Sequence, residues 1–306
     1  MENHHVIFTK EMRKTHTILI PDMLPIHFRL IIAVFEKYGY NMVLLQNSAR
    51  VVVDEGLKNV HNDTCYPALL VVGQFIDALK SGKYDPERVA LMISQTGGGC
   101  RASNYIHLLR KALAADYPDV PVISLNFSGM EKSPGFKITL PILLKLLNAV
   151  LYGDLLMSLY NQCKPYEKTA GETDKVLEEM EKRLSAMIKG GGFGKKKRNY
   201  KMIIDAFSAI ERTGEKKPRV GIVGEIYVKY SPLANNHLEE FLIARKIKRN
   251  DGHVGIIPRR IFDFRGVRTC CAGAYGLRAV LHGKQRQRRK NLRLQKYAHA
   301  PVGASL

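Results

Sequence analysis

The stretch HNDTCYPALLVVGQFIDALKSGKYDPERVALMISQTGGGCRASN, residues 61–104, joins a helical pattern, a strand and a glycine loop. Apolar residues recur at helical spacing over residues 66–80, and a short β-type run follows at Val89–Ser94. A second helical pattern covers residues 102–115, beyond a triple glycine. A strand between two helices predicts an α/β fold. Gly73, inside the first helix, predicts close packing of that helix against the sheet.

Two cysteines, Cys65 and Cys100, each stand at the start of one of these helical patterns. Cys65 follows N-cap residue types such as Thr64, and it precedes Pro67, a typical first-turn residue. Backbone N–H groups at a helix N-terminus favour thiolate over thiol. Two thiolates at one end of a sheet predict a site for a soft metal or an iron–sulfur cluster. The alternatives are two small buried side chains, or a disulfide, which a reducing compartment disfavours.

The residues before this stretch predict the opening of a parallel sheet. Thr17–Ile20 and residues 42–45 read as strands, and a helical pattern that starts at Pro25 separates them. A further β-type run lies at residues 121–125. We expect a three-layer α/β domain with a mainly parallel sheet, in which ligands bind at the carboxyl ends of the strands. The loop of residues 21–23, which contains an aspartate, lies at such an end.

Two loops on the same edge of the sheet supply the predicted substrate-binding residues. Gly97, Gly98 and Gly99 let backbone N–H groups approach a cluster sulfide, a carboxylate or a thioester oxygen. Ser128 and Gly129 lie in the loop after the next strand. The triple glycine matches neither GxxxxGK[ST] nor GxGxxG, so a nucleotide site is not supported. A plain strand-to-helix turn is the alternative reading.

The middle of the chain is helical by pattern. Residues 140–160 form the most apolar stretch and approach membrane-spanning length. Polar and charged side chains interrupt it, so we expect a buried or amphipathic helix rather than a membrane span. Two more helices are predicted at residues 172–189 and 202–210. Together these elements form an expected helical bridge at residues 140–215.

A second α/β unit is expected after the bridge. Residues 219–228 predict a strand, and residues 233–243 predict the helix that follows it. Glu225 is expected at the end of this strand, facing the cleft between two domains as a substrate-binding residue; an ordinary solvated acid is the alternative. The predicted organisation is thus an N-terminal α/β domain at residues 1–139, the helical bridge, and an incomplete second α/β domain at residues 216–244.

The basic charge is concentrated at the C-terminal end. Residues 1–244 contain 32 Lys and Arg against 26 Asp and Glu, whereas residues 245–306 contain 16 against 2. A basic tail predicts nucleic-acid binding, but no helix-turn-helix, RRM, KH or zinc-finger pattern accompanies it. After Ala244 the sequence lacks clear 3.6 or 2 periodicity. From the residues alone, this segment is either a genuine basic tail or a disordered, non-native stretch.

Several uncommon strings in the chain agree in order with one family. HNDTCYPALLVVGQFIDALKSGKYD, ISQTGGGCRASNYIHLLRKAL, VPVISLNFSGMEKSPGFK and RVGIVGEIYVKYSPLANNHLEEFL resemble the 2-hydroxyacyl-CoA dehydratase D-component family. The resemblance is strongest to its long branch, in which an activase-like module is fused to a dehydratase-like module, and it runs from about Thr15 to about Ala244. Because the resemblance stops abruptly inside the helix predicted at residues 233–243, it implies a shifted reading frame or a truncation there, with residues 245–306 non-native or disordered; a genuine basic tail is the rival reading. In this family three cysteines from separate loops hold a [4Fe–4S] cluster. Cys65 and Cys100 match the first two, and no residue here matches the third.

The resemblance implies a function. In the family an ATP-dependent activase delivers one electron through the cluster to a thioester carbonyl, and the resulting ketyl radical expels the 2-hydroxyl group. This implies a lyase fragment, inactive alone, whose partners are the activase module, the remaining dehydratase segment and an acyl-CoA-type substrate. Five irregularly spaced cysteines and the absence of an apolar leader favour a reduced cytoplasmic setting. The alternatives are a related iron–sulfur reductase with another small substrate, or a basic nucleic-acid-binding α/β protein.

Overall fold

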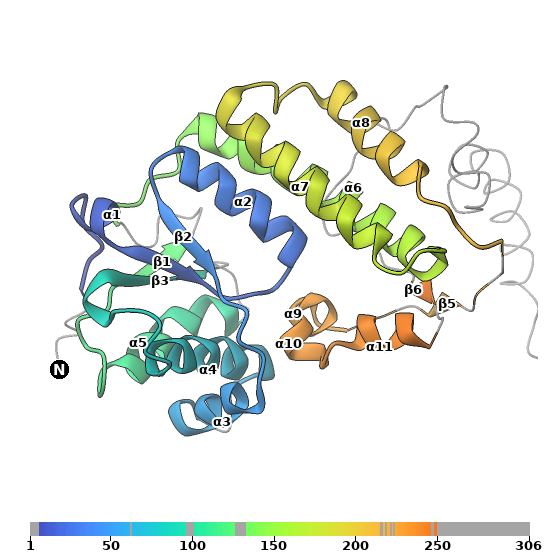
Figure 1. The fold of residues 1–306 in the computed structure, drawn as a ribbon. Coiled ribbons are helices and arrows are strands. Elements are labelled where there is room, and N and C mark those ends of the chain that lie inside the picture. Colours follow the sequence, from blue (N-terminus) through green and yellow to red (C-terminus); the bar gives the residue numbers. More distant parts are fainter. Residues whose placement is uncertain are drawn as a thin grey trace, which may run out of the picture. The chain divides into compact units, whose positions relative to one another are not determined.

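The computed structural model describes residues 6–61, 63–95, 101–125, 133–214, 217, 219–220, 222, 224–245 and 248–249. Cys100, Gly97 to Gly99, Ser128, Gly129 and the tail from residue 250 lie outside these residues, so the predictions made for them are not tested. The sequence-based prediction of an α/β fold with a parallel sheet is confirmed (Figure 1).

Most of the elements lie where the sequence pattern placed them. In chain order the helices and strands are α1 (Met12–Thr15), β1 (Thr17–Ile20), α2 (Pro25–Lys37), β2 (Asn41–Leu44), α3 (Arg50–Asn59), α4 (Tyr66–Lys80), β3 (Val89–Ser94), α5 (Tyr105–Leu113), β4 (Val122–Leu125), α6 (Leu140–Cys163), α7 (Glu172–Gly190), α8 (Lys196–Ser208), β5 (Arg219–Val220), α9 (Ile226–Tyr230), α10 (Pro232–Asn235), α11 (Leu238–Ala244) and β6 (Lys248–Arg249). Short 3-10 turns lie at Pro86–Arg88, Arg101–Asn104 and Lys164–Tyr166.

Four strands form the main sheet in the order β2-β1-β3-β4, and all neighbouring strands are parallel. In the register of the sheet, Ile18 of β1 lies opposite Met42 of β2 on one side and opposite Ala90 of β3 on the other. β3 is buried at its first five positions, as expected for a strand covered on both faces by helices. Short apolar strands of this kind are stable only when helices bury both faces.

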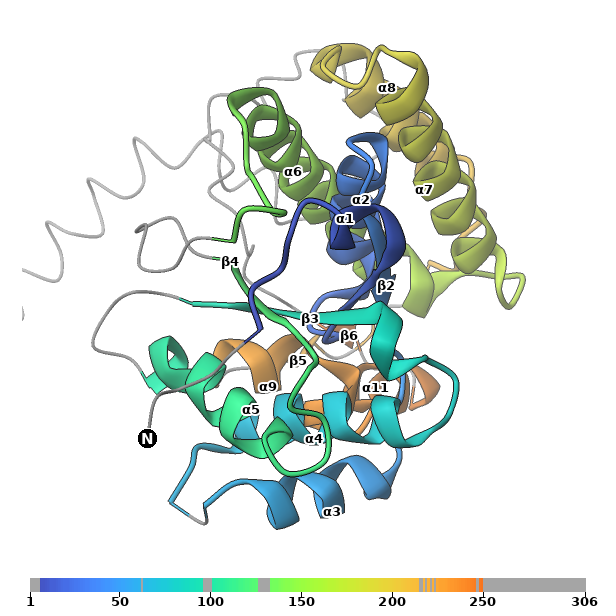
Figure 2. The same ribbon diagram turned by 90° about the vertical axis from the view of Figure 1, so that its left-hand side faces the viewer.

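Helices cover the two faces of the sheet in two groups. Leu19, Leu91 and Ile93 share one buried cluster with α4 and α5. Because side chains alternate along a strand, the intervening positions face the side on which α2 packs. Figure 2 shows α4 and α5 on one side of the sheet and α2 and α6 on the other, which gives three layers.

Helix α3 forms an outer layer against α4, and two glycines set the distance between these helices. A Cβ atom on Gly73 would lie 1.9 Å from the backbone oxygen of Val52, and one on Gly56 would lie 2.4 Å from that of Leu69. Only glycine fits at either position. The prediction that Gly73 packs against the sheet is therefore wrong, because its close contact is with α3.

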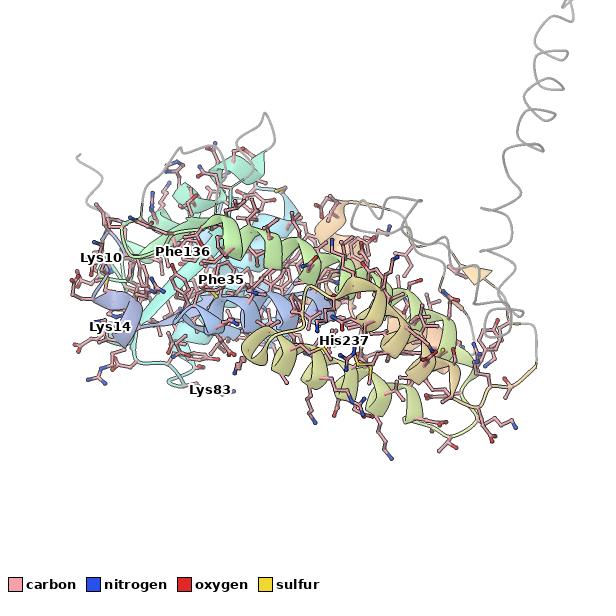
Figure 3. All side chains as sticks on the ribbon, turned by 90° about the horizontal axis from the view of Figure 1, so that it is seen from above. Lys10, Lys14, Phe35, Lys83, Phe136 and His237 are labelled. Carbon is pink, nitrogen blue, oxygen red and sulfur yellow. The ribbon has the colours of Figure 1, made fainter. Side chains whose placement is uncertain are left out.

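Aromatic side chains fix the chain where it enters α6. Phe35 of α2 and Phe136 lie beside each other in Figure 3, with ring centroids 5.5 Å apart. Tyr40 packs on both rings. Its hydroxyl also accepts a hydrogen bond from the Lys137 N–H at 3.0 Å, which ties residues 136–137 to the end of α2.

Helix α6 is a packing element of the helical layer. By length and composition alone, the segment from Leu140 to Tyr166 is long and apolar enough to cross a membrane. The second half of α6 is largely buried and contacts α2, α7 and α8, whereas Leu144 and Leu147 in its first half are exposed. The half-buried pattern agrees with the predicted buried or amphipathic helix.

The second half of the chain differs from its sequence-based reading. The strand predicted at residues 219–228 is wrong in its second part: among the described residues β5 covers Arg219–Val220, and α9 starts at Ile226, where Glu225 caps it. The helix predicted at residues 233–243 is divided into α10 and α11. Asn236 and His237 adopt left-handed backbone angles, with φ of 53° and 55°, which no α-helix accommodates.

Segments α9 and α10 pack on the N-terminal domain. Tyr227, Leu233 and Ala234 belong to the same buried cluster as α4, β1 and β3. Residues 1–256 form one compact unit by their contacts. The described residues after 224 therefore cover part of the sheet domain, while the predicted division into domains stays a prediction.

Candidate functional site at the carboxyl edge of the sheet

The direction in which successive strands are added to the sheet reverses between β1 and β3, and this position is the topological switch point of the sheet. The chain leaves β1 through α2 to β2 on one side, and it then crosses back through α3 and α4 to β3 on the other. In open α/β sheets the connections on either side of such a point diverge, and ligands bind in the crevice outside the carboxyl ends of the strands. Here the relevant ends are Ile20 of β1 and Ser94 of β3.

Cys65 lies at this edge. The chain passes directly from α4 into β3, so α4 runs opposite to the strands and begins at their carboxyl ends. Cys65 is the N-cap of α4, with φ −64° and ψ 148°, and its side chain is free and half-buried. Its Sγ lies 2.8 Å from the hydroxyl of Tyr105, the first residue of α5. The sequence therefore placed this thiol correctly, at a helix start on the predicted edge.

A hydrogen-bonded glutamine joins the ends of β3 and β4 to the start of α5. Gln95, directly after β3, is buried and donates from Nε2 to the Ser103 carbonyl at 3.0 Å. Its Oε1 accepts a hydrogen bond from Ser124 Oγ of β4 at 2.7 Å. These contacts hold the described ends of the loops that contain the predicted residues Cys100, Gly97, Gly98, Gly99, Ser128 and Gly129, which themselves lie outside the described residues.

Glu225 has a local structural role. Its side chain is exposed and accepts a hydrogen bond from the Val228 N–H at 3.0 Å, which caps the first turn of α9. This explains why a glutamate precedes the helix. Its predicted contact with substrate stays a prediction.

Asp22 is a residue that the sequence located only as part of a loop. It follows β1 and is 9% exposed. Its N–H donates to Gln74 Oε1 at 3.1 Å, and its carbonyl accepts from Ser231 Oγ at 3.1 Å. Its Oδ1 is buried without a hydrogen-bond partner among the described residues. Burial raises the pKa of this carboxyl to about 7, and the nearby Arg29 guanidinium offsets only part of the rise.

Tyr227 of α9 is the second residue that sequence patterns missed. It is 6% exposed, and its hydroxyl has no hydrogen bond that meets ordinary geometry within the described part of the chain. Burial raises the pKa of this phenol, Ser231 partly offsets the rise, and Asp22 adds to it. The side chain of Tyr66, which follows Cys65 in the sequence, also raises the pKa of Tyr227. Asp22 and Tyr227 thus share the region at the start of α4, although 204 residues separate them in the sequence.

The described residues supply one thiol to this edge. No group of three or more His, Cys, Asp or Glu side chains that could hold a metal ion occurs within the described ranges. Cys163 is buried at the end of α6, where its Sγ lies 3.7 Å from the Phe207 carbonyl. Its burial in the helical layer is typical of a cysteine that packs as a small hydrophobic side chain.

Comparisons of the chain with protein-family models, with curated proteins and with solved structures found no match.

Proposed function

We propose that this chain is the cysteine-loop part of a 2-hydroxyacyl-CoA dehydratase-like iron–sulfur protein. The observation that carries the proposal is the position of Cys65: a free, half-buried thiol at the N-cap of α4, on the carboxyl edge of a parallel sheet. An iron–sulfur cluster is held by several cysteine thiolates at once. Thiolates on separate loops can do this when the loops lie at the same edge of the sheet. The order of the matching sequence strings supports the same family.

The residues present fit one corner of a three-cysteine site. Cys65 would bind iron through its thiolate, together with Cys100 and with a third ligand that the matched part of the chain lacks. The Tyr105 hydroxyl, 2.8 Å from Sγ, would donate a hydrogen bond to the bound sulfur and so orient it. A [4Fe–4S] cluster held there would supply electrons one at a time to a bound thioester. The implied partners are an ATP-dependent activase module and the remaining dehydratase segment, in a cytoplasmic setting.

Iron binding tests this proposal on the full 306-residue chain. Anaerobic titration with Fe²⁺ and sulfide, followed by visible absorbance and by iron and sulfide counting after desalting, should show weak binding through thiolate. Cys65→Ser should abolish the thiolate-to-iron absorbance, whereas Cys163→Ala, at a buried thiol outside the site, should retain it. Equal absorbance from the wild type and Cys65→Ser would overturn the proposal. A stable four-iron cluster would show that the third ligand lies within this chain.

A further inference from the structure

An exposed apolar stripe runs along the first half of α6. Leu140, Leu144 and Leu147 are 67%, 54% and 54% exposed, and their spacing of four and three residues places them on one face of the helix. Exposed apolar side chains that lie singly need no explanation, whereas a contiguous group marks an interaction surface. The described part of the chain leaves this leucine stripe uncovered.

A basic turn lies next to the leucine stripe, between α7 and α8. Residues 189–201, KGGGFGKKKRNYK, contain six Lys and Arg and no acid. Lys195, Lys196, Lys197 and Arg198 are all exposed, and within the described ranges none of the four has an ion pair. Cations in the first turn of a helix oppose its dipole, and the first turn of α8 contains no acid that would offset them. The stability of α8 therefore does not explain this cluster of cations.

Hydrogen bonds hold the basic turn against α6. The Tyr152 hydroxyl of α6 donates to the Phe193 carbonyl at 2.6 Å, and Asn199 Nδ2 donates to the Gly192 carbonyl at 3.0 Å. Phe193 is buried and packs edge-on against Tyr152. Leu147 precedes Tyr152 by about one and a half turns of α6. The basic turn is therefore fixed beside the leucine stripe, and Figures 1 and 2 show the start of α6 close to the connection between α7 and α8.

Both features lie at the amino edge of the sheet, opposite to the edge that contains Cys65. Helix α2 ends at Lys37, shortly before β2 begins, so its last turn marks the amino edge. Lys37 Nζ donates to the Lys189 carbonyl at the end of α7 at 3.1 Å. Phe136, shortly before α6, packs on the last turn of α2. A partner bound here would leave the carboxyl edge open to a ligand.

We propose that the leucine stripe and the basic turn together form a surface that binds anionic lipid bilayers. Apolar side chains at the boundary of headgroups and acyl chains, flanked by cations that attract anionic lipids, are how interfacial helices bind a membrane without crossing it. The cations select an anionic partner, and the leucines favour a bilayer over a nucleic acid.

The charge at this end of the molecule suits an anionic surface. Residues 136–153, which include the leucine stripe, contain two lysines and no acid. Two cations of the basic turn are paired with acids, Lys189 with Glu36 and Lys201 with Asp205. The four cations at the start of α8 remain for lipid headgroups, and each cation near an anionic bilayer strengthens binding.

A single tryptophan in the leucine stripe tests insertion, because the chain contains no tryptophan of its own. Leu144→Trp in the full chain should shift its emission to shorter wavelength when vesicles of equal parts phosphatidylserine and phosphatidylcholine are added. Lipids brominated on their acyl chains should quench this emission. Vesicles of phosphatidylcholine alone should cause a much smaller shift. Leu57→Trp, at a leucine of α3 that is 52% exposed, is the matched control and should not respond.

Removal of charge tests the basic turn separately, in the Leu144→Trp background. The test variant replaces three cations of the basic turn: Lys196→Gln, Lys197→Gln and Arg198→Gln. The control replaces three exposed cations on other surfaces: Arg50→Gln, Lys168→Gln and Lys175→Gln. The test variant should need more lipid for half of the emission shift, by about fivefold for each charge removed. The control has the same net charge and the same C-terminal tail, and it should respond like Leu144→Trp.

Unchanged emission of Leu144→Trp with anionic vesicles, or the same lipid dependence for the two charge variants, would overturn the proposal. An emission shift without lipid that grows with protein concentration would assign the stripe to a second copy of the chain. An equal shift with duplex DNA would assign the surface to nucleic acid, and either result also overturns the proposal. Leu147→Trp repeats the test if Leu144→Trp folds poorly by circular dichroism. Because no iron is present, these results are independent of the cluster test.

Discussion

At the residue scale, Asp22 shows how burial changes the chemistry of one side chain. An aspartate in an unfolded chain has a pKa near 3.9, whereas burial raises the pKa of Asp22 to about 7. Between about pH 4 and pH 7 the folded state therefore holds a proton that the unfolded state has lost. A carboxyl shifted in this direction makes folding less favourable as pH rises through that window, by about 1.4 kcal/mol for each unit.

Replacing Asp22 by Asn should remove this dependence. Asn resembles the protonated carboxyl and does not ionise, so Asp22→Asn should gain free energy of unfolding relative to the wild type, by about 3 kcal/mol between pH 4 and pH 7.5. Urea unfolding at four pH values measures the difference. Asp116→Asn, at an exposed aspartate, serves as the control and should show a small, flat difference. An equally flat difference for Asp22→Asn would contradict the assigned shift.

A second buried pair joins two helices. His27 Nε2 of α2 lies 3.1 Å from Asp154 Oδ1 of α6, and both side chains are buried. Gly153 packs on the histidine ring, where a Cβ atom would lie 2.4 Å from Cδ2. The pair therefore lies where the two helices pack closely against each other.

Removing one member of this pair should cost more than removing both. His27→Leu removes one hydrogen-bond partner of the buried Asp154 carboxyl, and we expect a loss of about 3 kcal/mol in the free energy of unfolding. Asp154→Leu should cost a similar amount. The double variant should be more stable than the sum of the single losses predicts, as measured by urea unfolding in a double-mutant cycle. Strictly additive losses would show that the pair does not couple α2 to α6.

At the element scale, glycines decide how closely α3 and α4 approach. Gly73→Ala would place a Cβ atom 1.9 Å from the Val52 carbonyl oxygen, and backbone cannot move aside as a flexible side chain can. We expect the helices to separate, with a loss of about 2–3 kcal/mol in stability. Gly190→Ala, where a Cβ atom would have nothing within 4 Å, is the matched control. Thermal unfolding compares the two, and equal midpoints would contradict the close contact.

At the scale of the whole molecule, the net charge predicts binding to nucleic acid, which the fold by itself does not predict. The excess of basic residues lies after Ala244, and the chain carries a net charge of +20. We expect weak binding to duplex DNA of any sequence that falls steeply with salt and is lost by about 200 mM, because released counterions supply most of its free energy. Fluorescence anisotropy measures this, and a variant without residues 257–306 is the control. Sequence-specific binding that survives 200 mM salt would favour the nucleic-acid alternative.

The sequence by itself determined the local elements of the first domain. Period-2 and period-3.6 patterns located β1 to β4, α2, α4 and α5, because each element must bury an apolar face of its own periodicity. N-cap residue types and Pro67 located Cys65 at a helix start, because helix capping also depends on residues that are neighbours in the sequence. Residues 219–228 were misread as a strand because a β-branched run cannot be distinguished from a short capped helix by pattern alone.

Only the tertiary structure decided which distant residues meet. Nothing local to Asp22 or Tyr227 shows that they share one buried region, since their proximity depends on how α9 and α10 pack against α4 and the end of β1. The same holds for Gly73, whose partner is α3 rather than the sheet, and for the contact between His27 and Asp154. Local propensity acts over a few residues, whereas burial and unpaired polar groups arise only when segments far apart in the chain exclude water from each other.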